Sequence, residues 1–219
     1  MKTVAVLISG EGRNLQALID AQARGLIEGR IGLVVSNRAE APGLARAATA
    51  GIPTRVLAHG SYASREAFDA ALADAIEAVQ PQAVALAGFM RILTPAFIER
   101  FRGRLLNIHP SLLPRYPGLH THRRVLEAGD REHGATVHFV TEELDGGPRI
   151  VQGSLSVSPD DTVTSLADRV MQQIERRIYP QAIQWLLRGD VQLTDAAAYW
   201  RGAPLSEPLG LDDLESPFP

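Results

Sequence analysis

Short apolar runs alternate with helix-length amphipathic segments from the first residues of the chain onward. The runs KTVAVLIS, IGLVVSN and TRVLA are separated by NLQALIDAQARG and APGLARAATAG. Apolar runs without polar alternation are typical of strands in a parallel sheet that is covered on both faces. The rhythm therefore predicts a βαβαβ beginning.

The middle of the chain continues this alternation. In SREAFDAALADAIEAVQ, apolar residues recur at i, i+4, i+8 and i+11 behind Ser64, which predicts a helix with Ser64 as its N-cap. AVALAGF then reads as a strand, and TPAFIERFRG, with Pro95 in its first turn, reads as a short helix. RLLNIH is the strand that follows.

Later in the sequence the pattern changes. GATVHFVTEELDGGPRIVQGSLSVS consists of two alternating runs around DGG, which indicates an antiparallel addition to the sheet. Residues from about 162 to 188 read as one long helix. The expected fold class is α/β: an open, mostly parallel, twisted Rossmann-like sheet with helices on both faces and an antiparallel addition in the C-terminal part. We expect a single domain over residues 1–200.

Residues 201–219 are expected to form a flexible tail, because they are rich in proline and acid and lack a core-forming pattern. The N-terminal MKTVAVLISG has too few apolar residues for a signal peptide or a membrane span, so we expect a cytoplasmic protein without a membrane partner. The net charge of -3 argues against nucleic acid as a partner. The absence of cysteine excludes disulfides and thiol nucleophiles.

The loop SGEGRN, residues 9–14, follows the first strand and opens the first helix. Free backbone N–H groups and the helix dipole favour an anion there, and phosphate is the obvious candidate. It is not a dinucleotide fingerprint, because Leu15 stands where the third glycine belongs and the second strand ends in Asn37 rather than in an acid. A simple tight turn is the alternative.

Asn107 and His109 stand at the carboxyl end of a predicted strand, where open α/β sheets bind ligands. Because they are two positions apart, their side chains project to the same side. Asp145, in the DGG turn, could reach the same crevice. The three suggest carbonyl chemistry, with Asn107 and protonated His109 donating to an oxyanion and Asp145 assisting proton transfer. A locally satisfied strand end and an ordinary Asp-Gly turn are the alternatives.

The remaining histidines offer a rival interpretation. His120 and His122 could form a zinc site with Asp145, but no recognised ligand spacing occurs, and we expect no metal. His59, His133 and His138 have no convincing partners in the sequence.

Four stretches, SGEGRN, GFMRIL, NIHPSLLPRYPGLHTH and GATVHFVTEELDGGPRI, carry a resemblance to a known family. In this order they resemble the folate-dependent formyltransferases, and within them the members that act on glycinamide ribonucleotide (GAR). The resemblance runs from about residue 2 to about residue 200. It implies transfer of the formyl group of 10-formyltetrahydrofolate, a co-substrate, to the glycyl amine of GAR in de novo purine biosynthesis. Both partners are small molecules.

The resemblance also assigns residues. Asn107, His109 and Asp145 match the family's catalytic positions, and Asn107 also contacts the folate. The GAR phosphate would lie on Gly12, Arg13 and Asn14. The folate site would be closed by the loop from Val140 to Asp145 and lined by Arg65, Met90, Arg91, Ile92 and Leu93. Without the resemblance, the three apolar members of that set would be ordinary core and Arg65 a solvated charge.

Two departures from the family pattern stand out. The family often has Ser at the position of Arg13, which leaves the backbone donors intact but changes the side chain near the anion. The segment QQIERRIYP is one residue longer than the usual version. Assigning Glu175 to the ribose hydroxyls therefore depends on where that residue is inserted.

Three other functions are weighed against GAR formylation. A formyltetrahydrofolate hydrolase carries an additional amino-terminal domain, for which the glycine loop at residue 9 leaves no room. A methionyl-tRNA formyltransferase adds a carboxy-terminal domain, whereas only about 20 weakly patterned residues follow Trp200. A non-catalytic phosphosugar-binding module would bind GAR without turning over the folate.

Overall fold

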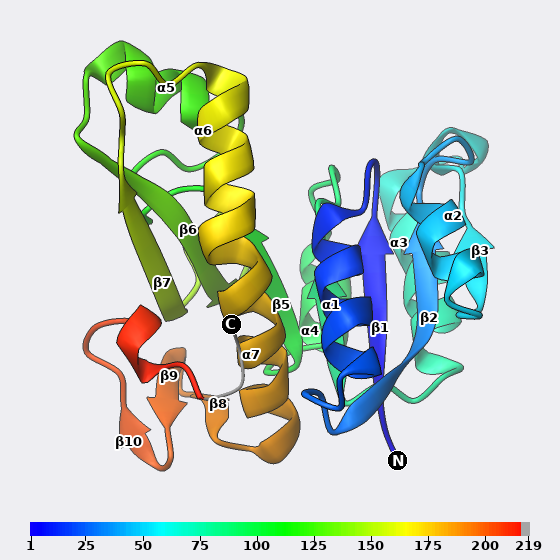
Figure 1. The fold of residues 1–219 in the computed structure, drawn as a ribbon. Coiled ribbons are helices and arrows are strands. Elements are labelled where there is room, and N and C mark those ends of the chain that lie inside the picture. The colour runs from blue at the N-terminus through cyan, green and yellow to red at the C-terminus, as the bar shows by residue number, and fades with distance from the viewer. Residues whose placement is uncertain (216–219) are drawn as a thin grey trace.

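A seven-stranded sheet forms the centre of the computed structural model, which describes residues 1–215 (Figure 1). The strand order is β3-β2-β1-β4-β5-β6-β7; β1 to β5 pair in parallel, and β6 and β7 pair antiparallel. The strands are β1 (Lys2–Ile8), β2 (Gly29–Ser36), β3 (Thr54–Val56), β4 (Ala83–Leu86), β5 (Leu105–His109), β6 (Glu132–Phe139) and β7 (Arg149–Ser156). The predicted α/β class with an antiparallel addition is confirmed.

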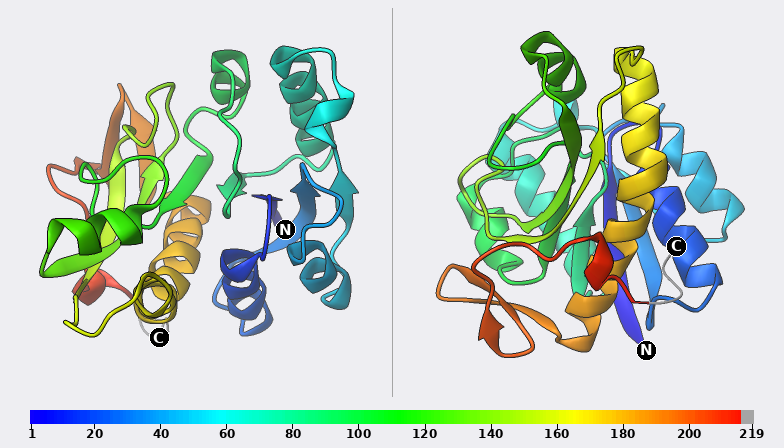
Figure 2. Two further views of the ribbon diagram at one scale, coloured as in Figure 1. Left: turned by 90° about the horizontal axis from the view of Figure 1, so that it is seen from above. Right: turned by 60° about the vertical axis from the view of Figure 1, so that its left-hand side comes forward.

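Helices cover both faces of this sheet. Viewed from above, α3 and α4 lie on one side, and α1, α2 and α7 lie on the other (Figure 2). The helices are α1 (Arg13–Ala23), α2 (Gly43–Thr49), α3 (Arg65–Glu77), α4 (Pro95–Arg100), α5 (Thr121–Ala128), α6 (Val163–Val170) and α7 (Arg176–Arg188). The predicted caps are present, because the Ser64 side chain accepts from the N–H of Ala67 and Pro95 opens α4. Among the described residues, no helix is long and apolar enough to cross a membrane.

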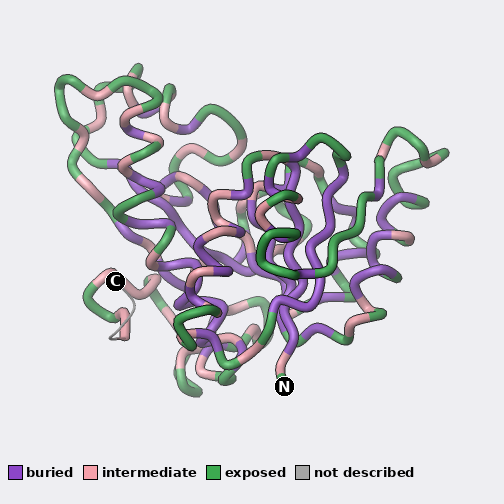
Figure 3. The backbone as a smooth tube through the Cα atoms, turned by 45° about the vertical axis from the view of Figure 1, so that its right-hand side comes forward, coloured by how far each residue is buried: buried purple, intermediate pink, exposed green. Residues whose placement is uncertain are grey.

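The core has two halves, one on each face of the sheet. In β1, Val4, Val6 and Ile8 pack into the half under α1 and α7, whereas Ala5 and Leu7 pack into the half under α3 and α4. Figure 3 shows the central strands buried and the outer turns exposed. Burial on both faces explains why the sequence of β1 is a continuous apolar run.

The long C-terminal helix expected over residues 162–188 is present, with a local change in its winding. Helices α6 and α7 are joined without a break by a π-helical segment, Met171–Glu175 (Figure 1). Further along, the buried hydroxyl of Tyr179 lies 2.8 Å from the carbonyl oxygen of Leu86 and 3.2 Å from that of Leu106. Burial raises the pKa of Tyr179 well above its usual range, so the hydroxyl stays protonated as a donor. It ties α7 to the strands that carry the candidate site.

A small second sheet was missed by the sequence analysis. It consists of β8 (Val191–Thr194), β9 (Ala197–Trp200) and β10 (Ala203–Pro204), all antiparallel. The turn between β8 and β9 contains Asp195 and Ala196, both with positive φ. Hairpin turns of this kind are usually recognised in a sequence by a glycine. This turn contains no glycine, which explains why the sequence analysis missed the hairpin.

The segment from residue 201 to 215 makes specific contacts with the domain, although a flexible tail was expected there. Leu209 exchanges backbone hydrogen bonds with Ile150 and Gln152 beside β7. Glu215 accepts hydrogen bonds from the side chains of Trp185 and Arg188 on α7. The rest of the expected tail, residues 216–219, lies outside the described residues, and the domain division at residue 200 stays a prediction.

Replacing Tyr179 by Phe should lower the free energy of unfolding by about 1–2 kcal/mol, because a buried donor to the sheet is lost while its acceptors remain buried. Urea denaturation followed by far-UV circular dichroism measures this change. Tyr199→Phe on partly exposed β9 is the matched control. Equal stability of the two variants would contradict the role given to the Tyr179 hydroxyl.

Candidate active site

The glycine loop brings the beginnings of two helices together. Gly12 is the N-cap of α1 and has a φ of 70°. A Cβ at Gly12 would lie 2.7 Å from the Cα of Gly43 in α2, and the N–H of Gly43 donates to the carbonyl of Gly10 at 3.0 Å. Both the backbone conformation and this close approach require glycine at position 12. The first amides of α1 thereby border an open cavity.

A buried hydrogen-bond network fixes the ends of β1, β2 and β4. The hydroxyl of Ser9 donates to Asn37 Oδ1 at 2.6 Å and accepts from the N–H of Met90 at 2.8 Å. Asn37 Nδ2 lies 3.2 Å from His59 Nδ1. Both polar atoms of the Asn37 side chain therefore have partners inside the protein, and His59 has the partner that the sequence did not reveal.

Asn107, His109 and Asp145 lie together, as the sequence analysis expected. His109 Nδ1 is 3.4 Å from Asp145 Oδ2, and His109 Nε2 donates to the carbonyl oxygen of Tyr116 at 2.9 Å. The Asp145 side chain is 9% exposed and also accepts from the N–H of Gly118 at 2.8 Å. Asp145 has a φ of 53°, an uncommon conformation that Asp tolerates better than most residues. The carboxylate thus orients the imidazole.

His138 belongs to the same cluster and was missed by the sequence analysis. It stands directly opposite Asn107 in the β5–β6 register, and its Nε2 lies 3.2 Å from Asn107 Nδ2 and 3.8 Å from Asp145 Oδ1. Its Nδ1 donates to the carbonyl of Phe139 at 2.9 Å. Burial lowers the pKa of His138, so the neutral ring accepts the Asn107 N–H and fixes the amide. The pairing depends on the register between β5 and β6, for which the sequence carries no local signal.

Glu175 is buried at the end of the π-helical segment and accepts a hydrogen bond from Asn14 Nδ2. Burial raises the pKa of this carboxyl, while the Asn14 bond and the charge of Arg13 act in the opposite direction. A π turn holds more residues than an α turn and is frequent at functional sites. The π-helical segment ends at Glu175, and Glu175 lines the cavity.

The other histidines do not support the zinc interpretation. His122 Nδ1 lies 2.9 Å from His133 Nε2, and the two rings meet edge to face. Burial lowers the pKa of both, that of His133 to about 4, so both are neutral at pH 7. His120 is exposed at the start of α5. Within residues 1–215, no group of three or more potential ligand side chains could hold a metal ion.

Four of the predicted folate residues follow β4, and the fifth, Arg65, begins α3. Met90 and Ile92 are 64% and 61% exposed, whereas Leu93 is buried in the core. Arg65 is exposed at the first position of α3, and Arg91 is partly buried with its Nε unpaired. On the β6–β7 loop, Leu144 next to Asp145 is also exposed. Met90 and Ile92 are therefore not core residues, and their exposure fits an apolar wall for a ligand.

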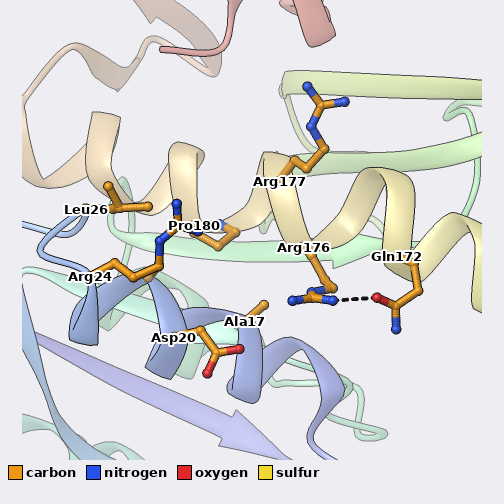
Figure 4. Close-up of a pocket in the computed structure, with 9 residues that line it drawn as sticks. Ala17, Asp20, Arg24, Leu26, Gln172, Arg176, Arg177 and Pro180 are labelled. Atoms are coloured by element: carbon orange, nitrogen blue, oxygen red, sulfur yellow. Dashed lines mark hydrogen bonds between the residues drawn. The ribbon is translucent and has the colours of Figure 1, made fainter. Parts of the chain in front are cut away.

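One cavity, of about 360 Å³, gathers the residues expected at the phosphate and ribose. Asn107, His109 and Asp145 are not in its lining, which reaches their neighbour Pro110. A second cavity of about 210 Å³ lies between α1 and α7 and contains none of the expected site residues (Figure 4). The lining of the first consists of Ser9, Gly10, Glu11, Gly12, Arg13, Asn14, Arg38, Ala87, Gly88, Met90, Pro110, His122, Ala167, Met171 and Glu175.

An open α/β sheet with this cluster at the end of β5 matches a known class of protein. The formyl transferase family model matches residues 2–183, and the chain belongs to this family. It is 52% identical over 202 residues to phosphoribosylglycinamide formyltransferase of Escherichia coli (strain K12), covering 92% of this chain and 95% of that protein. It is 47% identical over 190 residues to the trifunctional purine biosynthetic protein adenosine-3 of Homo sapiens, covering 87% of this chain and 19% of that protein.

A solved structure agrees with this family membership. The phosphoribosylglycinamide formyltransferase of Coxiella burnetii superposes with a TM-score of 0.91 at 44% identity, covering 95% of this chain and 98% of that one. The family resemblance predicted from the sequence motifs is confirmed.

The free energy of unfolding of the Glu175→Gln variant should rise relative to that of the unchanged protein as the pH rises. The carboxyl has a folded-state pKa above its unfolded value, so its contribution to stability is present at low pH and is lost as the pH rises through the folded-state pKa. Glutamine keeps an acceptor for Asn14 without the buried charge. Urea unfolding at pH 4 and pH 8 measures the difference, with exposed Glu127→Gln as control. If the difference in unfolding free energy between Glu175→Gln and the unchanged protein does not grow with pH, the raised pKa assigned to Glu175 is wrong.

Proposed function

We propose that this protein transfers the formyl group of 10-formyltetrahydrofolate to the glycyl amine of GAR, giving formyl-GAR and tetrahydrofolate in de novo purine biosynthesis. The observation that carries the proposal is the contact of His109 with Asp145, next to Asn107 at the end of β5. The names of the similar proteins support the same reaction.

GAR would bind in the 360 Å³ cavity. Its phosphate would accept hydrogen bonds from the backbone N–H groups of Gly12, Arg13 and Asn14, where the dipole of α1 favours negative charge. The buried carboxylate of Glu175 would accept hydrogen bonds from the ribose hydroxyls, which return part of the free energy lost by burying it. The Oδ1 atom of Asn14 is buried and unpaired, and a ligand hydroxyl could satisfy it.

The folate would lie against the segment that follows β4. Met90 and Ile92 supply exposed apolar surface, and Leu93 anchors the segment to the core. Arg91 and Arg65 supply positive charge for the polar parts of the folate. The loop from Val140 to Asp145 would cover the bound co-substrate.

In the reaction, the amine of GAR attacks the formyl carbon and gives a tetrahedral intermediate with an oxyanion. The Asn107 amide and His109 Nε2–H would donate to this oxyanion. In the present structure the Tyr116 carbonyl oxygen accepts from His109 Nε2, and the oxyanion would take over that bond. Asp145, on the Nδ1 side of the ring, would hold the imidazole in place and assist proton transfer from the amine to the departing folate nitrogen. Breaking the bond from that nitrogen to the formyl carbon completes the transfer.

The proposal is tested by following the absorbance change as 10-formyltetrahydrofolate loses its formyl group, with and without GAR and without added metal. Turnover only in the presence of GAR is expected. Turnover without GAR would mean that water is the acceptor and that the protein is a hydrolase. No turnover in either case would favour a binding module.

Asn107→Ala should lower kcat by about 100-fold or more, equivalent to about 3 kcal/mol, because one oxyanion donor is lost. His109→Ala and Asp145→Asn should abolish measurable transfer. Unchanged circular dichroism spectra are the control for folding. Near-normal kcat in His109→Ala and Asp145→Asn would overturn the assigned mechanism.

A further inference from the structure

Arg13 and Asp168 form an ion pair beside the candidate phosphate site. Arg13 is the first residue of α1, Asp168 is on α6, and Arg13 Nη1 lies 2.8 Å from Asp168 Oδ1. Arg13 lines the cavity, as do Ala167 and Met171 on either side of Asp168 in the sequence. The pair therefore links two helices that border the same cavity.

The charge of Arg13 acts inside the cavity. It opposes the burial that raises the pKa of Glu175, and it adds to burial and to His109 in lowering the pKa of His122. Both of these residues line the cavity. A phosphate at the first amides of α1 would therefore lie within the field of this guanidinium.

Asp168 places a negative charge next to the Arg13 guanidinium. The two side chains are 39% and 55% exposed, and an exposed pair of this kind contributes little to stability. A phosphate dianion can form stronger, charge-assisted hydrogen bonds with Arg13 than the solvated carboxylate does. Phosphate and Asp168 thus compete for one guanidinium.

We propose that Asp168 is a positioning residue that sets the affinity for GAR by holding Arg13, which the phosphate of GAR draws away on binding. This inference rests on the proposed function. Its consequence is that the carboxylate weakens GAR binding, and that this weakening acts through Arg13. The Michaelis constant for the folate, which binds elsewhere, should not respond.

A double-mutant cycle tests the proposal by steady-state kinetics. Asp168→Asn should lower the KM for GAR about two- to fivefold, since the ion pair no longer competes. Arg13→Ser should raise it about tenfold, through loss of a charge-assisted hydrogen bond. In the Arg13→Ser background, Asp168→Asn should change the KM for GAR by less than twofold. Neither change should alter the KM for the folate.

Asp160→Asn is the matched control, because Asp160 is exposed just before α6 and its loss removes the same charge. It should leave the KM for GAR unchanged. A residue that merely fastened α6 to α1 would change the thermal midpoint and leave the KM ratio intact. An unchanged or raised KM for GAR in Asp168→Asn would overturn the proposal, and so would an equal decrease in both backgrounds, which would indicate simple repulsion.

Binding of inorganic phosphate separates this inference from the proposed function. The shift of the thermal midpoint with phosphate concentration requires no turnover, and Asp168→Asn should reach half of the maximal shift at about two- to fivefold lower phosphate. Lack of GAR turnover by the unchanged protein would overturn the proposed function, with this measurement still deciding how Asp168 acts. The same phosphate dependence in both proteins would overturn the inference.

Discussion

The contact between Asp145 and His109 is the interaction on which the candidate site depends. It brings a carboxylate from the β6–β7 loop onto an imidazole at the end of β5, and it therefore requires the antiparallel addition to the sheet. The same carboxylate accepts from Gly118 and lies beside His138. One side chain thus contacts the end of β5, the loop that follows it and the end of β6. A small displacement of the β6–β7 loop would separate the carboxylate from the imidazole.

Around this contact the ionisable groups are held in different states by burial. His138 is kept neutral and accepts a hydrogen bond from the Asn107 amide, which fixes that amide at the end of β5. Glu175 is buried across the cavity at a cost in stability that a bound hydroxyl would offset. Burial of the Glu175 carboxyl lowers the stability of the fold, whereas the hydrogen bonds of Tyr179 to β4 and β5 raise it by holding α7 on the sheet.

How far the sequence predicts this structure depends on the range of each interaction. Asn107 and His109 were paired by a local rule, since residues two apart in a strand share a face, and the buried strands followed from their apolar runs. The partnership of His138 with Asn107 depends on strand register 31 residues away, and no local pattern encodes it. The contact between His122 and His133 likewise forms only when α5 packs beside β6. Residue types were recognisable, whereas their pairing required the fold.

The π-helical segment takes up one residue more than a continuous α-helix would, without loss of the core. A residue inserted into an α-helix would rotate everything beyond it by about 100°, which would turn Tyr179 and Trp185 out of the core. A π turn takes up the additional residue locally, so α7 keeps its apolar face on the sheet. The same turn leaves Glu175 facing the cavity and bonded to Asn14. Because the π turn keeps the helix phase in α7, the same helix carries both the Tyr179 hydrogen bonds and an acid at the cavity.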